Sequence, residues 1–207
     1  MSFTITDAST GVQIAAARAQ LERHAALLLG RLLFAYARLE SAPDLCLVWV
    51  DDGKDLEAWT RKIERMNFGA KRGLLKARAA RQACAASRTA YAAWLARAHV
   101  VRERRNVLAH GRLGVNVRCG SLSAVLSRAT SATMQAVEFP LADLEWLVAE
   151  ADCLQRELSD LRSSFPLSTC PPASPVPARL RLRRRAMPTA YCTRHYHALH
   201  LIYGCAT

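Results

Sequence analysis

The chain has 207 residues, of which 51% are hydrophobic and 22% charged, and its formal net charge is +12. This length suits one domain of about 160 residues followed by a tail. Residues 1–10 lack the basic start and apolar run of a secretory signal, and Arg31 interrupts the longest apolar segment, residues 25–37. We therefore expect a soluble cytoplasmic protein that does not insert into a membrane.

The charge is unevenly distributed along the chain. Residues 61–105 contain 13 Lys and Arg against two acidic residues, whereas residues 138–160 contain seven acidic residues against one Arg. A basic segment of this kind is what a polyanion-binding groove requires. The alternative is that residues 61–81 form a solvated helix face whose charge is balanced by the acidic segment.

Neither the cysteines nor the histidines form a convincing metal site. The seven cysteines are scattered and never spaced as Cys-x-x-Cys, so without a secretory signal they are expected to be reduced thiols. Cys192, His195, His197 and His200 have a loosely metal-like composition, but no matched second pair of ligands accompanies them. We expect neither a metal nor another cofactor.

The first half of the chain predicts helices. Capping residues such as Thr10 precede an amphipathic helix over residues 12–40, which Pro43 is expected to end. The apolar run at residues 45–50 could be a turn of helix or a strand, and its periodicity does not decide between them. A second helix is predicted over residues 56–66.

Two further helices are predicted before the composition of the chain changes. A strongly basic helix is predicted near residues 70–83, and a fourth helix over residues 86–109, with Tyr91 and Trp94 as core anchors. Gly111 follows the fourth helix and is well suited to the left-handed residue that often ends a helix.

The remainder predicts a small sheet and one more helix. Residues 115–118, 122–128 and 133–139 are short runs rich in Ser, Thr and Val, typical of a β-hairpin or meander. Pro140 then opens a last helix over residues 141–161. The fold class is therefore mainly α, with one domain over residues 1–165.

Residues 166–207 have a different composition from the rest. Prolines cluster just after residue 170, and six arginines without any acidic residue follow. This composition is typical of a disordered basic tail that could hold a polyanion non-specifically.

The end of the fourth helix carries the most informative motif, Arg-Glu-Arg-Arg-Asn-Val-Leu-Ala-His-Gly at residues 102–111. At about 100° per residue, Arg102, Asn106 and His110 lie nearly above one another, while Arg105 lies roughly 140° away from His110. Histidine can accept or donate a proton near neutral pH, and arginine offers a charged bidentate fork to phosphate oxygens. Because RNA supplies its own 2′-OH nucleophile, these residue types could cleave it without a metal.

The spacing of Arg105, Asn106 and His110 resembles the Arg-x4-6-His motif of the HEPN superfamily, in which a polar residue commonly follows the arginine. The resemblance rests on this motif and on the all-helical prediction. It implies a HEPN-like helical bundle acting as a homodimeric, metal-independent endoribonuclease. Arg105 and His110 would be the catalytic pair, and Asn106 would orient the phosphate or His110.

The resemblance also implies a toxin or defence setting, in which an antitoxin or other regulatory protein could be a partner. HEPN toxins controlled by a nucleotidyltransferase often carry a tyrosine two residues after the histidine. Arg112 occupies that position here, which argues against that regulated subtype.

RNA is the expected partner. The basic residues around the motif are expected to bind its phosphates: Arg102, Arg104, Arg112, Lys71 and Arg72. Two alternatives remain open. The same surface could belong to a non-catalytic helical module that binds nucleic acid or protein, or the motif arginines could pair with the acidic last helix in a purely structural protein.

Overall fold

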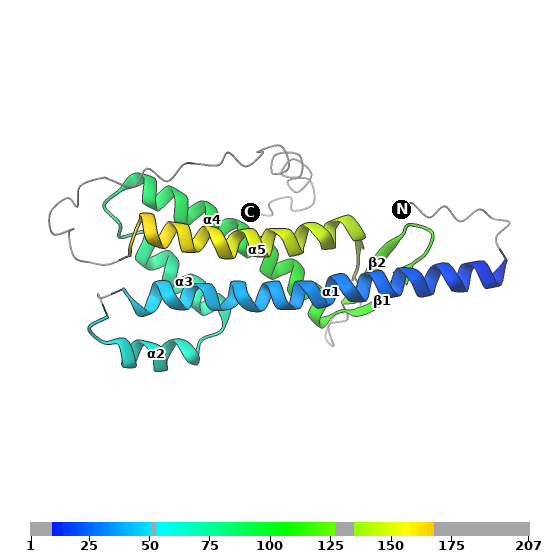
Figure 1. Ribbon diagram of the computed structural model, residues 1–207, viewed down its shortest axis with the longest axis horizontal. Helices are drawn as coiled ribbons and strands as arrows, with labels where there is room; N and C mark the ends of the chain where they lie inside the picture. The colour runs from blue at the N-terminus through cyan, green and yellow to red at the C-terminus, as the bar shows by residue number, and fades with distance from the viewer. Residues whose placement is uncertain (1–9, 51–52, 127–134, 168–207) are drawn as a thin grey trace. The chain divides into compact units, whose positions relative to one another are not determined.

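The computed structural model describes residues 10–50, 53–126 and 135–167. Five helices and one three-stranded antiparallel sheet occur in these ranges (Figure 1). The predicted class, mainly helical with a small sheet before the last helix, is confirmed. Nearly all of the predicted basic tail lies outside the described residues. The elements are α1 (Gly11–Val48), α2 (Leu56–Glu64), α3 (Phe68–Ala79), α4 (Ala85–His110), β1 (Arg112–Asn116), β2 (Ser121–Leu126), β3 (Gln135–Pro140) and α5 (Leu141–Ser164).

Helix α1 begins as predicted but continues beyond its predicted end. The Thr10 side chain and Gln13 form a reciprocal capping box at its start. The prediction that Pro43 ends the helix is wrong, because Pro43 lies inside α1 and is buried. An interior proline costs about 3 kcal/mol, which the burial of Cys46 and Leu47 in the last turns offsets. The apolar run at residues 45–50 therefore begins as the last turn of α1 and is not a strand.

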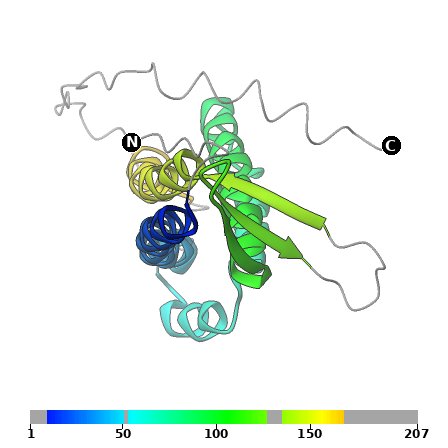
Figure 2. The same cartoon turned by 90° about the vertical axis from the view of Figure 1, so that its right-hand side faces the viewer.

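The helices pack in pairs around one core. Helices α1 and α5 lie side by side, and α4 packs against α5 (Figures 1 and 2). Helix α3 contacts both α1 and α4, and α2 contacts α1. The predicted anchors Tyr91 and Trp94 are fully buried between these helices. None of the helices in the described ranges is long and apolar enough to cross a bilayer.

The sheet follows α4 directly. Strand β2 lies between β1 and β3, with Leu113 of β1 opposite Ala124 of β2. Helix α4 contacts β2, and α5 starts immediately after β3 at Leu141. The sheet therefore joins the C-terminal end of α4 to the N-terminal end of α5, and it is visible beside those helices in Figure 2.

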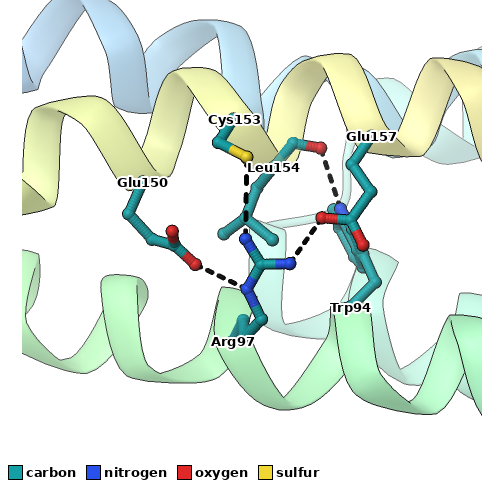
Figure 3. Close-up of polar contacts among 6 residues, drawn as sticks. All are labelled: Trp94, Arg97, Glu150, Cys153, Leu154 and Glu157. Atoms are coloured by element: carbon teal, nitrogen blue, oxygen red, sulfur yellow. Dashed lines mark hydrogen bonds and ion pairs between the residues drawn. The ribbon is translucent and has the colours of Figure 1, made fainter. Parts of the chain in front are cut away.

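A partly buried ion-pair network joins α4 to α5 (Figure 3). The Arg97 guanidinium donates to Glu150 at 2.7 Å, to Glu157 at 2.6 Å and to the Cys153 sulfur at 3.7 Å. One turn earlier, Trp94 Nε1 donates to the Leu154 carbonyl at 2.8 Å. Burial alone would lower the pKa of Arg97, but the hydrogen bond and charge of Glu150 and the charge of Glu157 raise it.

Arg97→Ala should lower the free energy of unfolding by about 3 kcal/mol, because it leaves Glu150, which is only 8% exposed, without its counter-charge. Urea denaturation of the variant and the parent chain measures this difference. Arg18→Ala is the matched control. Arg18 pairs with Glu22 on an exposed face of α1, so its loss should cost less than about 0.5 kcal/mol. Equal effects of the two substitutions would contradict the role of the network.

Candidate functional site

The end of α4 is held in place by contacts on both sides of the motif histidine. Leu108 is buried, and the Gly111 amide donates to the Val107 carbonyl at 2.9 Å. Strand β1 then begins at Arg112. His110 itself is exposed at the last residue of the helix. The motif histidine is thus presented to solvent from a fixed position.

Gly111 does not have the predicted left-handed conformation. Its φ of −80° and ψ of 153° are extended, so the prediction of a left-handed C-cap is wrong. The glycine is required for a different reason. A Cβ at this position would lie 2.7 Å from the Val107 carbonyl oxygen and 3.1 Å from the Cβ of Ala124 in β2. The absence of a side chain allows β2 to approach the end of α4 closely.

Arg105 is directed toward Tyr36 of α1, and no hydrogen bond joins it to His110 among the described residues. Its guanidinium lies 4.7 Å from the centre of the Tyr36 ring, and its Nη1 donates to Asn106 Oδ1 at 3.5 Å. Burial, together with Glu40, raises the pKa of Tyr36 to about 12, although Arg105 and Arg102 act in the opposite direction. The phenol therefore stays neutral, and the ring is a suitable cation–π partner. Within one chain, the structure brings Arg105 to Asn106 and Tyr36.

Arg72 and Arg102 lie close enough for their charges to act on each other and on Tyr36. A Cβ at Gly69 of α3 would lie 3.6 Å from Arg102 Nη2, so the guanidinium covers the start of α3. Arg72 donates through Nη2 to the Leu95 carbonyl at 3.0 Å. Burial lowers the pKa of Arg72 and the charge of Arg102 lowers it further, although an arginine remains charged at any ordinary pH.

Two of the five predicted phosphate-binding residues form ion pairs with acidic residues of other helices. Lys71 is buried, and its Nζ lies 2.7 Å from a carboxylate oxygen of Asp44, which corrects the expectation that it faces RNA. Arg104 donates to Asp143 at 2.9 Å and lies 5.8 Å from the Trp146 ring. By contrast, Arg112 is exposed.

The acidic residues of α5 pair with α1 and α4. Asp143 and Glu150 meet Arg104 and Arg97, while Asp152 accepts from Arg38 at 2.7 Å. These pairs therefore do not support the alternative in which the acidic segment balances the charge of residues 61–81. The purely structural alternative requires the motif arginines to pair with the acidic last helix. Of these arginines, Arg104 alone does so within the described residues.

A groove of about 640 Å³ lies between α3 and α4. Its basic and titratable lining residues are Arg72, Lys76, Arg88 and His99. Sequence reasoning did not identify Lys76, Arg88 or His99 as site residues. The signal that could have found His99 and Arg88 is helical periodicity, because both share the face of α4 that carries Asn106 and His110.

No group of His, Cys, Asp and Glu within the described ranges could hold a metal ion. Comparison of the chain with protein-family models, with curated proteins and with solved structures found no match.

Gly111→Ala should lower the free energy of unfolding by about 1–3 kcal/mol, because the new methyl group would overlap the Val107 carbonyl and crowd Ala124. The midpoint of chemical denaturation reports this change. Gly114→Ala in β1 is the matched control, since nothing lies within 4 Å of a Cβ built there. A Gly114→Ala variant as unstable as Gly111→Ala would show that the close approach of β2 is not the cause.

Proposed function

We propose that this chain is a metal-independent endoribonuclease of HEPN type, in which His110 carries out proton transfer. One observation carries the proposal. His110 is exposed at the end of α4, on the same helix face as Asn106 and the half-buried Arg102. A proton-transfer group and phosphate-binding groups are thereby presented on one accessible surface.

The reaction requires little beyond these groups. The 2′-OH of one nucleotide attacks the adjacent phosphorus, and the bond from phosphorus to the 5′-oxygen of the next nucleotide breaks. The proton of the 2′-OH goes to a base, and the leaving 5′-oxygen receives a proton. His110 is suited to one of these transfers, and arginine stabilises the charge that develops on the phosphate oxygens. The products are a 2′,3′-cyclic phosphate and a 5′-hydroxyl.

The position of Arg105 favours a composite site made by two copies. Its guanidinium lies over Tyr36, and its direction on α4 is about 140° from that of His110. Two α4 helices that meet near a two-fold axis would bring the arginine of one copy toward the histidine of the other. We therefore propose a homodimer, which light scattering at micromolar concentration tests. A toxin or defence setting, with an antitoxin or other regulatory protein as partner, belongs to the same proposal.

His110→Ala should abolish RNA cleavage without changing the free energy of unfolding, because the exposed imidazole contributes little to packing. Gel analysis of a labelled RNA measures cleavage. His24→Ala is the control, since His24 is an exposed helical histidine outside the motif. Cleavage that survives His110→Ala would contradict the proposal.

Arg105→Ala should reduce the cleavage rate by an amount equivalent to about 2–4 kcal/mol of transition-state stabilisation. It should also lower stability by about 1 kcal/mol, because the guanidinium no longer covers Tyr36. Asn106→Ala should have a milder effect on the rate. Measuring the melting temperature of each variant separates loss of catalysis from loss of fold.

Cleavage should persist in EDTA, because the proposed chemistry uses His110 and Arg105 for proton transfer and charge stabilisation. The comparison is the rate of the same preparation before and after chelation and dialysis. A rate that falls to background in EDTA and returns with added Mg²⁺ would contradict the proposed mechanism.

The second candidate is a non-catalytic module that binds nucleic acid or protein. One observation favours it, namely that Arg105 is already engaged with Tyr36 and Asn106. The two candidates differ in whether His110 matters for turnover. Binding of RNA without His110-dependent cleavage would leave only the binding module.

A further inference from the structure

The groove between α3 and α4 has a floor of small residues. Gly69 and Gly73 of α3 face Ala92 and Ala96 of α4 across it. Nothing described lies within 4 Å of a Cβ built on Gly73. Flat groups can therefore approach the two helix backbones closely along the groove.

The rim of the groove is cationic. Lys76 and Arg88 line it and are exposed. Arg72 of α3 and His99 of α4 also line it. Arg88 also donates through Nη1 to the carbonyls of Gln82 at 2.6 Å and Ala83 at 2.9 Å, which fixes where its charge lies. A polyanion in the groove would meet positive charge along both walls.

One acidic residue, Glu103, lies near the rim of the groove. Glu103 accepts from Arg102 at 2.6 Å and lies 3.7 Å from His99. Its charge acts on Arg102, His99 and Arg72, whereas Lys76 and Arg88 have no acidic partner among the described residues. The net charge of the groove remains positive.

Arg72 has hydrogen-bonding capacity that the described residues do not fill. Its Nη2 bonds to the Leu95 carbonyl, but its Nε is buried and has no hydrogen-bond partner among them. A buried donor left unpaired costs about 1–3 kcal/mol. Because Nε is covered, an anionic oxygen in the groove would bond to Arg72 through a terminal nitrogen of its guanidinium.

The groove and the proposed active site lie on one face of α4. Arg88, Ala92, His99, Asn106 and His110 fall within a narrow range of directions at about 100° per residue. His99 precedes His110 by about 16 Å along the helix axis. A strand lying in the groove would therefore point toward His110.

We propose that the groove between α3 and α4 binds a single-stranded segment of RNA and guides it toward His110. That the bound strand is RNA rests on the proposed function. Phosphates contact Arg72, Lys76 and Arg88, and bases lie on the glycine and alanine floor. Helix α3 has 12 residues, or ~18 Å of length, which suits about five stacked nucleotides.

The chemistry of the lining predicts how this binding behaves. A groove between two adjacent helices is too narrow to hold a duplex, so single strands are preferred. Its lining contains no aromatic side chain within the described residues, so stacking contributes little and affinity depends mainly on phosphate contacts. Binding is therefore expected to be tolerant of sequence and strongly dependent on salt.

The test measures the binding of a probe that the proposed reaction cannot cleave. The probe is a fluorescent 2′-O-methyl oligouridine of about 12 nucleotides, which has an RNA backbone but no free 2′-OH. Fluorescence anisotropy gives its dissociation constant between about 50 and 200 mM salt. A 2′-O-methyl RNA hairpin whose stem pairs adenine with uracil serves as the comparison ligand and should bind more weakly.

Two pairs of variants locate the strand. Ala96→Glu places a negative charge in the groove, and Ala58→Glu places the same charge on an exposed position of α2 that does not line it. We expect Ala96→Glu to weaken binding by about tenfold or more at low salt and Ala58→Glu to have little effect. Lys76→Gln should reduce the slope of log affinity against log salt by about 0.7, whereas Lys54→Gln should not.

The outcomes separate this inference from the proposed function. If Ala96→Glu and Lys76→Gln bind the probe as the parent chain does, the groove is not the strand site, even when cleavage still depends on His110. If those variants lose binding while no variant or condition reveals cleavage, the groove assignment stands and the endoribonuclease proposal fails. His110→Ala should bind the probe normally, because its role is in the reaction.

Discussion

The position of α4 depends on the Arg97 network. Arg97 and Trp94 lie on the same face of α4, and both reach α5, through Glu150 and Glu157 and through the Leu154 carbonyl. The buried carboxylate of Glu150 is tolerated only where its counter-charge is correctly placed, so a rotation of α4 about its axis would leave that charge unpaired. The network therefore fixes which side of α4 faces α5 and which side faces outward. Hydrophobic packing alone constrains such a rotation less strictly, because apolar contacts are not directional.

This constraint divides the charges of α4 between two faces. Arg97 and Arg104 are seven residues apart, so they lie on one side of the helix and meet the acidic residues of α5. Arg88 and His99 lie on another side and line the groove toward α3. Because Asp143, Glu150 and Glu157 of α5 are engaged with the first side, the charge of the second remains available for a polyanion. The positive field at the groove and at the end of α4 thus follows from how α4 docks on α5.

Much of the fold could be predicted from local patterns, and the exceptions have physical causes. Apolar periodicity identified the helices, and Pro140 correctly marked the start of α5. Pro43 misled because a local rule about proline gives no weight to the burial of Cys46 and Leu47 beyond it. Gly111 was identified as special for the wrong reason. A left-handed conformation is a local property, whereas the approach of Ala124 comes from a strand that follows the glycine in the chain.

Prediction of the candidate site from the sequence is limited in the same way, because tertiary packing decides which side chains come together. The relation of Arg102, Asn106 and His110 depends only on helix geometry, so the sequence was sufficient to place them on one face. Lys71 and Arg72 are adjacent and both positively charged, yet about 100° of helix rotation separates them. Lys71 turns inward to Asp44, while Arg72 turns to the groove. Composition cannot distinguish two such neighbours, because the difference lies in which side of α3 meets α1. The groove itself is lined by Gly69 and Gly73 of α3 and by Ala92 and Ala96 of α4, and these four small residues come to one place only once the two helices have packed together.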